Sequence, residues 1–242
     1  MKNDAARLVR ALMGAEKGLE HHTHTLPQGC VVALSRDSGC GGEEVAPLLA
    51  QRLRVRCFDK ELLDAVVRET HQDRETLERL DDRASGKMEA WIYSALLGRN
   101  ASPDDYWRSM SRVILNLAEH GGVIVGRGAH LILARRRAFR VRLTGSLDIC
   151  AERVAKKEGL ALEEARKRVA AANAERHACI LTHFHRAISD ASTFDLVINT
   201  DRLENPAAVV EIILLAMRQA GFDVPAEEVQ AHAVLAAHAK CG

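Results

Sequence analysis

A glycine-rich turn between an apolar run and an amphipathic stretch is the part of this sequence with the clearest chemistry. Residues 31–35 are apolar, residues 45–53 have helical spacing, and the turn between them contains Ser38, Gly39, Cys40, Gly41 and Gly42. Glycines in such a turn let backbone N–H groups close around anionic oxygens at a helix N-terminus. The turn therefore predicts a phosphate site, and a purely structural strand-to-helix turn is the alternative.

The turn departs from a complete phosphate loop, which has a lysine and a hydroxyl residue after its last glycine. In an alignment on Gly41, the lysine position is Gly42 and the position of the first glycine is Arg36. The hydroxyl position falls near Glu43 or Glu44. A dinucleotide-binding fingerprint would need a third glycine where Glu44 stands, so that interpretation fails.

Polar residues also follow three other apolar runs. Asp59 and Lys60 follow the first run, Arg127 lies in a Gly-Arg-Gly sequence after the second, and Asn199 and Thr200 end the third. Ligands of parallel α/β sheets bind at the carboxyl ends of the strands. We therefore expect these side chains and the glycine turn to converge on one crevice.

The elements that must position these residues alternate along the chain, which is typical of βαβ units and a mostly parallel sheet. The predicted strands are 31–35, 55–58, 122–126, 139–143 and 194–199. The predicted helices are 43–53, 60–69, 73–82, 87–97, 104–119, 146–157, 161–182 and 205–220, with terminal helices at 3–20 and 225–239.

A long segment separates the second predicted strand from the third and is too large for a simple crossover. It contains every Trp and Tyr of the chain, namely Trp91, Tyr93, Tyr106 and Trp107. A helical substrate-binding insertion would use such rings to stack on a base. Packing of helices against one another is the alternative.

Composition describes an ordinary soluble globular protein, because 47% of the residues are hydrophobic and 28% are charged. A net charge of +1 argues against a dedicated nucleic-acid binder. No apolar run approaches the roughly 20 residues that span a bilayer, and the first residues lack the apolar core of a signal peptide. Six cysteines without a Cys-x-x-Cys pair are expected to be reduced. We expect a cytoplasmic protein with no membrane partner.

Arginines gather around the strand predicted at 139–143. They are Arg135, Arg136, Arg137, Arg140 and Arg142. Such a run could attract nucleotide or RNA. We interpret it as a solvated edge.

In order and spacing, these motifs resemble the signatures of the cytidylate kinase-like family, a branch of the phosphate-loop nucleoside monophosphate kinases. The resemblance rests on residues 35–42, 58–62, 125–129 and 195–200 and extends from about 31 to about 221. It implies an α/β fold with a five-stranded parallel sheet flanked by helices, a monophosphate-binding insertion at about 60–120 and a lid at about 160–190. The domain would span 30–222, between an N-terminal helix and linker (1–29) and a C-terminal helix (223–242).

The resemblance also implies substrates and a cofactor, which are ATP with Mg²⁺ and a nucleoside monophosphate, classically CMP. Residues 38–42 would hold the ATP phosphates, with Asn199 and Thr200 near its base. Arg127 would hold the acceptor phosphate, and Asp59 and Lys60 would position the acceptor. Homo-oligomer formation is left open.

Arginines of the lid are expected to stabilise charge on the transferring phosphoryl group, as in monophosphate kinases. Arg176, in the Glu-Arg step of the helix predicted at 161–182, is the first choice, and Arg186 is the second. Arg36 would add a third cation from the turn. A solvated basic helix face is the alternative for the lid arginines.

Glu43 and Glu44 depart from the family pattern, which commonly has a basic residue at the position of Glu43. A carboxylate 4 Å from a phosphate charge is repelled by roughly 4 kcal/mol at an effective dielectric constant of about 20. Glu44 would avoid this cost by ligating Mg²⁺; simple stabilisation of the helix N-terminus by both glutamates is the alternative. A non-catalytic nucleotide-binding or regulatory protein is therefore the rival to a kinase.

Overall fold

The structure, a computed structural model, describes residues 30–59, 64 and 103–225. Five strands form one sheet in the order β2-β3-β1-β4-β5, and every neighbouring pair is parallel. The strands are β1 (Val31–Arg36), β2 (Cys57–Phe58), β3 (Gly122–Val125), β4 (Phe139–Thr144) and β5 (Leu196–Asn199). This confirms the predicted α/β fold with a five-stranded parallel sheet.

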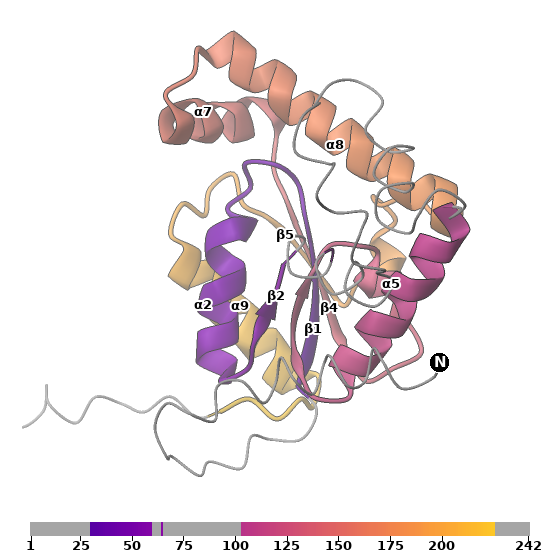
Figure 1. Cartoon of the computed structure of the whole chain (residues 1–242). Coiled ribbons are helices and arrows are strands. Elements are labelled where there is room, and N and C mark those ends of the chain that lie inside the picture. The colour runs from indigo at the N-terminus through magenta and orange to yellow at the C-terminus, as the bar shows by residue number, and fades with distance from the viewer. Residues whose placement is uncertain (1–29, 60–63, 65–102, 226–242) are drawn as a thin grey trace, which may run out of the picture.

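Helices cover both faces of the sheet and one of its ends (Figure 1). On one face lie α2 (Gly42–Leu53) and α9 (Pro206–Gln219), and on the other lies α5 (Pro103–Ala118). The paired helices α7 (Leu147–Glu158) and α8 (Leu162–Phe184) lie across the carboxyl end of the strands. Among the described helices, none combines the length and the apolarity that crossing a membrane requires.

The alternation of side chains along β1 explains why the sheet has a core on each face. Val32 and Leu34 belong to the cluster shared with α2 and α9, whereas Val31 and Ala33 belong to the cluster shared with α5. Successive residues of a strand point to opposite faces. The apolar run is continuous because both faces are buried, as expected for a parallel sheet.

The predicted boundaries differ from the structure where short elements intervene. β5 begins at Leu196 rather than at residue 194, since a 3₁₀ turn, η2 (Ala191–Thr193), precedes it. The helix α6 (Ala129–Ile132) was not predicted, because four residues are too few to show a helical period. The predictions for 1–29, 73–82, 87–97 and 226–239, and nearly all of 60–69 including Lys60, lie outside the described residues.

Candidate functional site

The glycine turn joins the carboxyl end of β1 to the N-terminus of α2. Gly39 has a left-handed φ of 79°, and a Cβ added there would lie 2.5 Å from the carbonyl oxygen of Cys150. Gly41, with φ 82°, is the N-cap of α2. A cavity of about 70 Å³ opens beside the turn and faces this helix N-terminus, whose dipole favours an anion.

A buried ion pair fixes the start of the turn. Asp37 accepts a hydrogen bond from Arg142 Nη2 at 2.8 Å and another from the Thr144 hydroxyl at 2.7 Å. Its backbone N–H donates to the carbonyl oxygen of Leu143 at 3.0 Å. The turn is therefore tied to β4 on two sides.

The predicted solvated arginine edge is wrong for Arg142. β4 lies inside the sheet between β1 and β5, and Arg142 is only 5% exposed. Arg140, two residues earlier on the same strand, pairs with Asp195 at 2.6 Å. The sequence showed the charges, but it did not show that aspartates directly after β1 and directly before β5 would neutralise them.

A second set of contacts, from β5 and α7, holds the middle of the turn. The Thr200 hydroxyl donates to the carbonyl oxygen of Cys40 at 3.0 Å. Arg153 donates to the Thr200 hydroxyl at 3.1 Å and to its carbonyl oxygen at 2.6 Å. Thr200 is 1% exposed, and Asn199 Oδ1 accepts from the Asp201 N–H at 2.8 Å. Thr200 thus lies against the turn, whereas the contact of Asn199 is with Asp201, and neither residue is among those that line the cavity beside the turn.

The thiol of Cys40 points away from the cavity. Its Sγ donates to the carbonyl oxygens of Asp37 at 3.0 Å and Leu143 at 3.6 Å. Burial raises the pKa of this thiol to about 12, which keeps it protonated and disfavours a nucleophilic role. Cys40 therefore contributes its backbone and its packing to the turn.

Glu43 and Glu44, the two glutamates expected to repel a phosphate, are both paired with Lys157 of α7. Lys157 Nζ lies 3.0 Å from Glu43 Oε2 and 2.6 Å from Glu44 Oε1. The hydrogen bond from Lys157 lowers the pKa of Glu43, and the two glutamates raise the pKa of Lys157. All three side chains are largely exposed, so solvent screens the pairing. This countercharge could not be predicted from the sequence, because Lys157 lies more than 100 positions from both glutamates.

α8 lies over the turn and contributes two polar side chains. Asn173 Oδ1 accepts the Ser38 N–H at 2.8 Å. Arg176 Nη1 lies 3.4 Å from the same oxygen and 3.5 Å from the carbonyl oxygen of Arg36. The predicted lid helix is thus in contact with the predicted phosphate turn. Arg186, the second choice, is 62% exposed and lies 3.8 Å from Asp190.

A second cavity, of about 280 Å³, lies beside the first and is larger. Arg127, Tyr106 and Ile180 are among its lining residues. Arg127 pairs with Asp64, whose other oxygen accepts the Tyr106 hydroxyl at 2.8 Å. Asp64 was not predicted, since a lone carboxylate in a helical stretch carries no distinguishing signal. Asp59 is exposed at the end of β2 and is not among the residues that line either cavity.

The predicted aromatic insertion is described only at Tyr106 and Trp107. Trp107 meets the ring of Tyr106 edge-on at 5.4 Å and the ring of Phe184 at 5.4 Å. Both residues are buried, at 2% and 7% exposure. These two rings therefore pack α5 against the end of α8, and only Tyr106 also reaches the second cavity.

His130 lines the second cavity and is 3% exposed. Its ring stacks on Phe194 with centroids 4.5 Å apart. Burial, with the nearby charges of Arg142 and Arg140, lowers the pKa of His130 to about 4. The cavity therefore has a neutral imidazole in its wall.

Two side chains connect the cavities, because Arg36 and Arg176 line both of them. The first cavity has the glycine turn as its wall and the second has Arg127. A group bound in one cavity and a group bound in the other would therefore meet beside these two guanidinium groups. This arrangement suits the transfer of an anionic group between two ligands.

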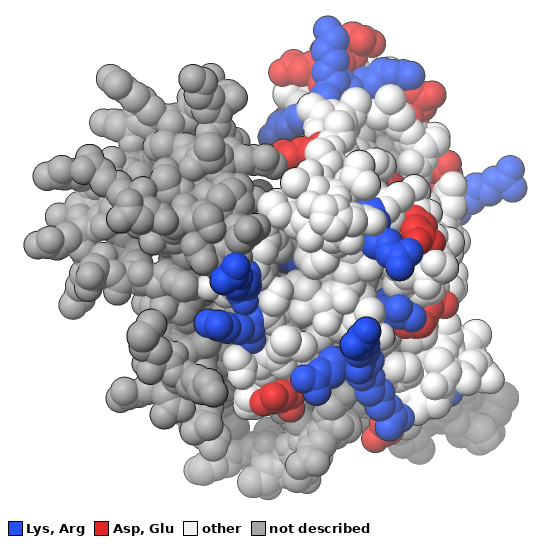
Figure 2. All heavy atoms as spheres, turned by 90° about the vertical axis from the view of Figure 1, so that its right-hand side faces the viewer, with Lys and Arg blue, Asp and Glu red and all other residues white. Residues whose placement is uncertain are grey.

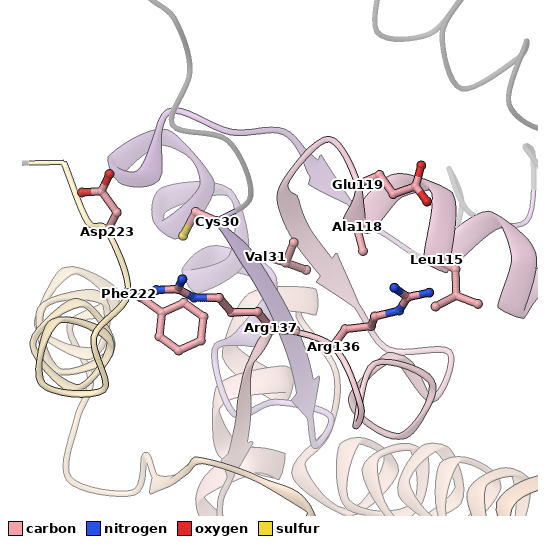
Figure 3. A pocket seen from close by; sticks show the side chains of 10 residues that line it. Cys30, Val31, Leu115, Ala118, Glu119, Arg136, Arg137, Phe222 and Asp223 are labelled. Carbon is pink, nitrogen blue, oxygen red and sulfur yellow. The ribbon is translucent and has the colours of Figure 1, made fainter.

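A further cavity, of about 330 Å³, lies at the opposite end of the sheet (Figure 3). Val31, where β1 begins, and Ala138, directly before β4, line it. Arg137 extends toward Phe222, and its guanidinium carbon lies 5.7 Å from the ring centroid. Since ligands of parallel sheets bind at the carboxyl ends of the strands, this cavity is separate from the candidate site.

Charge on the face shown in Figure 2 is distributed rather than concentrated. Lysine and arginine side chains lie there in several groups, most of them with acidic side chains nearby. Within the described ranges, no three His, Cys, Asp or Glu side chains gather closely enough to hold a metal ion.

Comparison with known proteins agrees with this geometry. Residues 31–202 match the cytidylate kinase-like family. A cytidylate kinase of Pyrococcus horikoshii is 28% identical over 110 residues, which are 46% of this chain and 57% of that protein. The chain thus matches little more than half the length of this relative.

A solved structure shares the fold. An uncharacterized protein from Eubacterium ventriosum superposes with a TM-score of 0.61 at 22% identity, covering 79% of this chain and 99% of the other. A shikimate kinase from Bacteroides thetaiotaomicron superposes with a TM-score of 0.46 at 16% identity, covering 78% and 98%.

Proposed function

Since the chain belongs to the cytidylate kinase-like family, we propose that it transfers the γ-phosphoryl group of ATP to a nucleoside monophosphate, with CMP as the expected acceptor. The observation that carries the proposal is the pair of adjacent cavities whose shared lining includes Arg36 and Arg176. A relative named as a cytidylate kinase supports the choice of CMP.

In the proposed mechanism the protein positions charge and supplies no covalent step. The turn and the N-terminus of α2 hold the ATP phosphates, and Arg127 holds the acceptor phosphate. Asp64 and Tyr106 keep the guanidinium of Arg127 oriented. Arg176 stabilises the negative charge that spreads over the transferring group.

A bound Mg²⁺ would supply positive charge that offsets part of the charge of the ATP phosphates. Glu44 stays the candidate ligand from the protein, since its carboxylate lies in the lining of the first cavity. Its Oε1 accepts from Lys157 at 2.6 Å, so Oε2 is the oxygen that could face a metal ion without breaking that pair. Thr200 would act mainly by holding the turn through the carbonyl oxygen of Cys40, and Asn199 by holding the N–H of Asp201.

The test is a steady-state assay of ADP release with ATP, Mg²⁺ and CMP, dCMP or UMP. Arg176→Ala should lower kcat by about 100- to 1,000-fold, the cost of removing one group that stabilises transition-state charge. Arg186→Ala is the matched control, because Arg186 lies outside the lining of both cavities; it should stay within about twofold of wild type. If ADP release is no faster with any monophosphate than without, the proposed transfer is wrong.

A nucleotide-binding protein without transfer is the second candidate, favoured by the contact between Asn173 and Ser38. Asn173 Oδ1 already accepts a turn N–H that a phosphate would otherwise use. Calorimetric titration of ATP with Mg²⁺, and then with EDTA, separates the two candidates. Tight binding that needs Mg²⁺, together with ADP release, supports the kinase. Equal binding in EDTA with no release supports the second candidate.

A further inference from the structure

The glycine at the usual lysine position of the loop has a steric cause. A Cβ added at Gly42 would lie 2.7 Å from Cγ and 2.8 Å from Cβ of Arg36. These atoms belong to the stem of Arg36, which is anchored at the end of β1 and has little freedom to move aside. Any side chain at position 42 would therefore collide with the stem of Arg36.

The other end of the same side chain lies beside a second glycine, Gly126, whose left-handed φ of 78° by itself favours glycine. A Cβ added at Gly126, directly after β3, would lie 2.7 Å from Nη1 of Arg36. The side chain of Arg36 thus runs from the turn, beside Gly42, to the end of β3, beside Gly126. This course explains why Arg36 is among the residues that line both cavities.

We propose that Arg36 performs the phosphate-binding task of the missing loop lysine, and that Gly42 is a glycine because this side chain passes it. The proposal rests on the proposed function, since it places the ATP phosphates at the turn. The positive charge that a complete phosphate loop has at position 42, in α2, is then supplied from position 36, at the end of β1. The glycine at position 42 is then a consequence of the relocation and does not indicate a lost activity.

Arginine suits this position for two reasons. Its guanidinium stays charged and offers a planar set of N–H donors that can contact two phosphate oxygens at once. It also lies where the donor and acceptor phosphates would meet, whereas Arg153 and Lys157 are found only in the lining of the first cavity. Those two cations are bound to Thr200 and to the glutamates, so their charge already serves the turn.

Calorimetry with the non-hydrolysable analogue β,γ-imido-ATP and Mg²⁺ tests the charge. Arg36→Gln keeps most of the stem and removes the cation, so the Kd should rise about tenfold or more, the value of a hydrogen bond to a charged group. Arg166→Gln is the matched control, because Arg166 pairs with Asp148 and is not among the lining residues of either cavity; its Kd should stay within about twofold. The single variant Arg36→Ala should also lose affinity for the analogue. The double variant Arg36→Ala with Gly42→Lys, which returns a cation to the usual lysine position, should recover most of that loss.

Thermal unfolding tests the steric part without any nucleotide. Gly42→Ala should lower Tm by several degrees in the wild-type chain, because overpacking a tight contact is destabilising. In the Arg36→Ala background the same substitution should leave Tm unchanged or raise it, since the stem is gone and alanine favours the helix.

The outcomes separate this inference from the proposed function. If wild type binds the analogue and Arg36→Gln binds it equally well, the inference is overturned and the kinase proposal stands. If Gly42→Ala lowers Tm by the same amount in the wild-type chain and in the Arg36→Ala chain, the steric explanation is overturned. If wild type neither binds the analogue nor releases ADP, the proposed function fails and the inference fails with it.

Discussion

Arg142→Met should destabilise the protein strongly, because it breaks the ion pair beneath the turn. The side chains of Arg142 and Asp37 are 6% and 10% exposed and 2.8 Å apart. Removing one partner of a buried pair leaves the other charge buried and costs about 3–5 kcal/mol. With a urea m-value of about 3 kcal/mol/M, the unfolding midpoint should fall by about 1–1.7 M.

Arg140→Met is the matched control, since both arginines point from β4 to an aspartate. The side chains of Arg140 and Asp195 are 22% and 32% exposed, so breaking this pair should cost about 1 kcal/mol or less. Adding Asp37→Asn to Arg142→Met should recover part of the loss, because no buried charge remains without a partner. A midpoint for Arg142→Met no lower than that for Arg140→Met would refute the reasoning.

Two further predictions concern titration and countercharge. His130 has a pKa of about 4 in the folded protein against about 6.5 in an unfolded chain, so the unfolded chain binds more protons between these values. Stability should fall by up to about 3 kcal/mol as the pH drops from 6.5 to 4, and His130→Phe should abolish this slope in urea titrations at several pH values; an unchanged slope would contradict it. Lys157→Met should weaken ATP binding by about threefold to tenfold in low salt and less in 0.5 M NaCl, since Glu43 and Glu44 lose their partner. Calorimetry checks this, and recovery in Lys157→Met with Glu43→Gln would show that the glutamate charge is the cause.

The sheet could be predicted from the sequence because its evidence is local. The strands β1 and β3 are short apolar runs, and a glycine-rich turn that is untypical of a regular helix or strand follows β1. Short elements escaped prediction for the same reason: α6 and η2 contain only four and three residues and show no period.

The partners of the charged residues could not be predicted, since they are set by three-dimensional neighbours distant in sequence. Arg142 looked solvated because its partner Asp37 lies 105 residues away. Lys157 and Glu44 are 113 residues apart. Resemblance to a family selected Arg176 and Arg127, but their contacts with the turn and with Asp64 required the structure.

The contacts that hold the glycine turn do not distinguish a kinase from a protein that only binds nucleotide. Asp37 is held by Arg142, and the carbonyl oxygen of Cys40 is held by Thr200. Neither contact involves a nucleotide, so the turn keeps its shape with or without one. A catalytic chain and a binding-only chain would therefore share this turn, and its shape is no evidence for either. They would differ at the cations between the cavities, where transition-state charge is stabilised. Substitutions of Arg36 and Arg176, rather than of the glycines alone, are thus the experiments that decide the function.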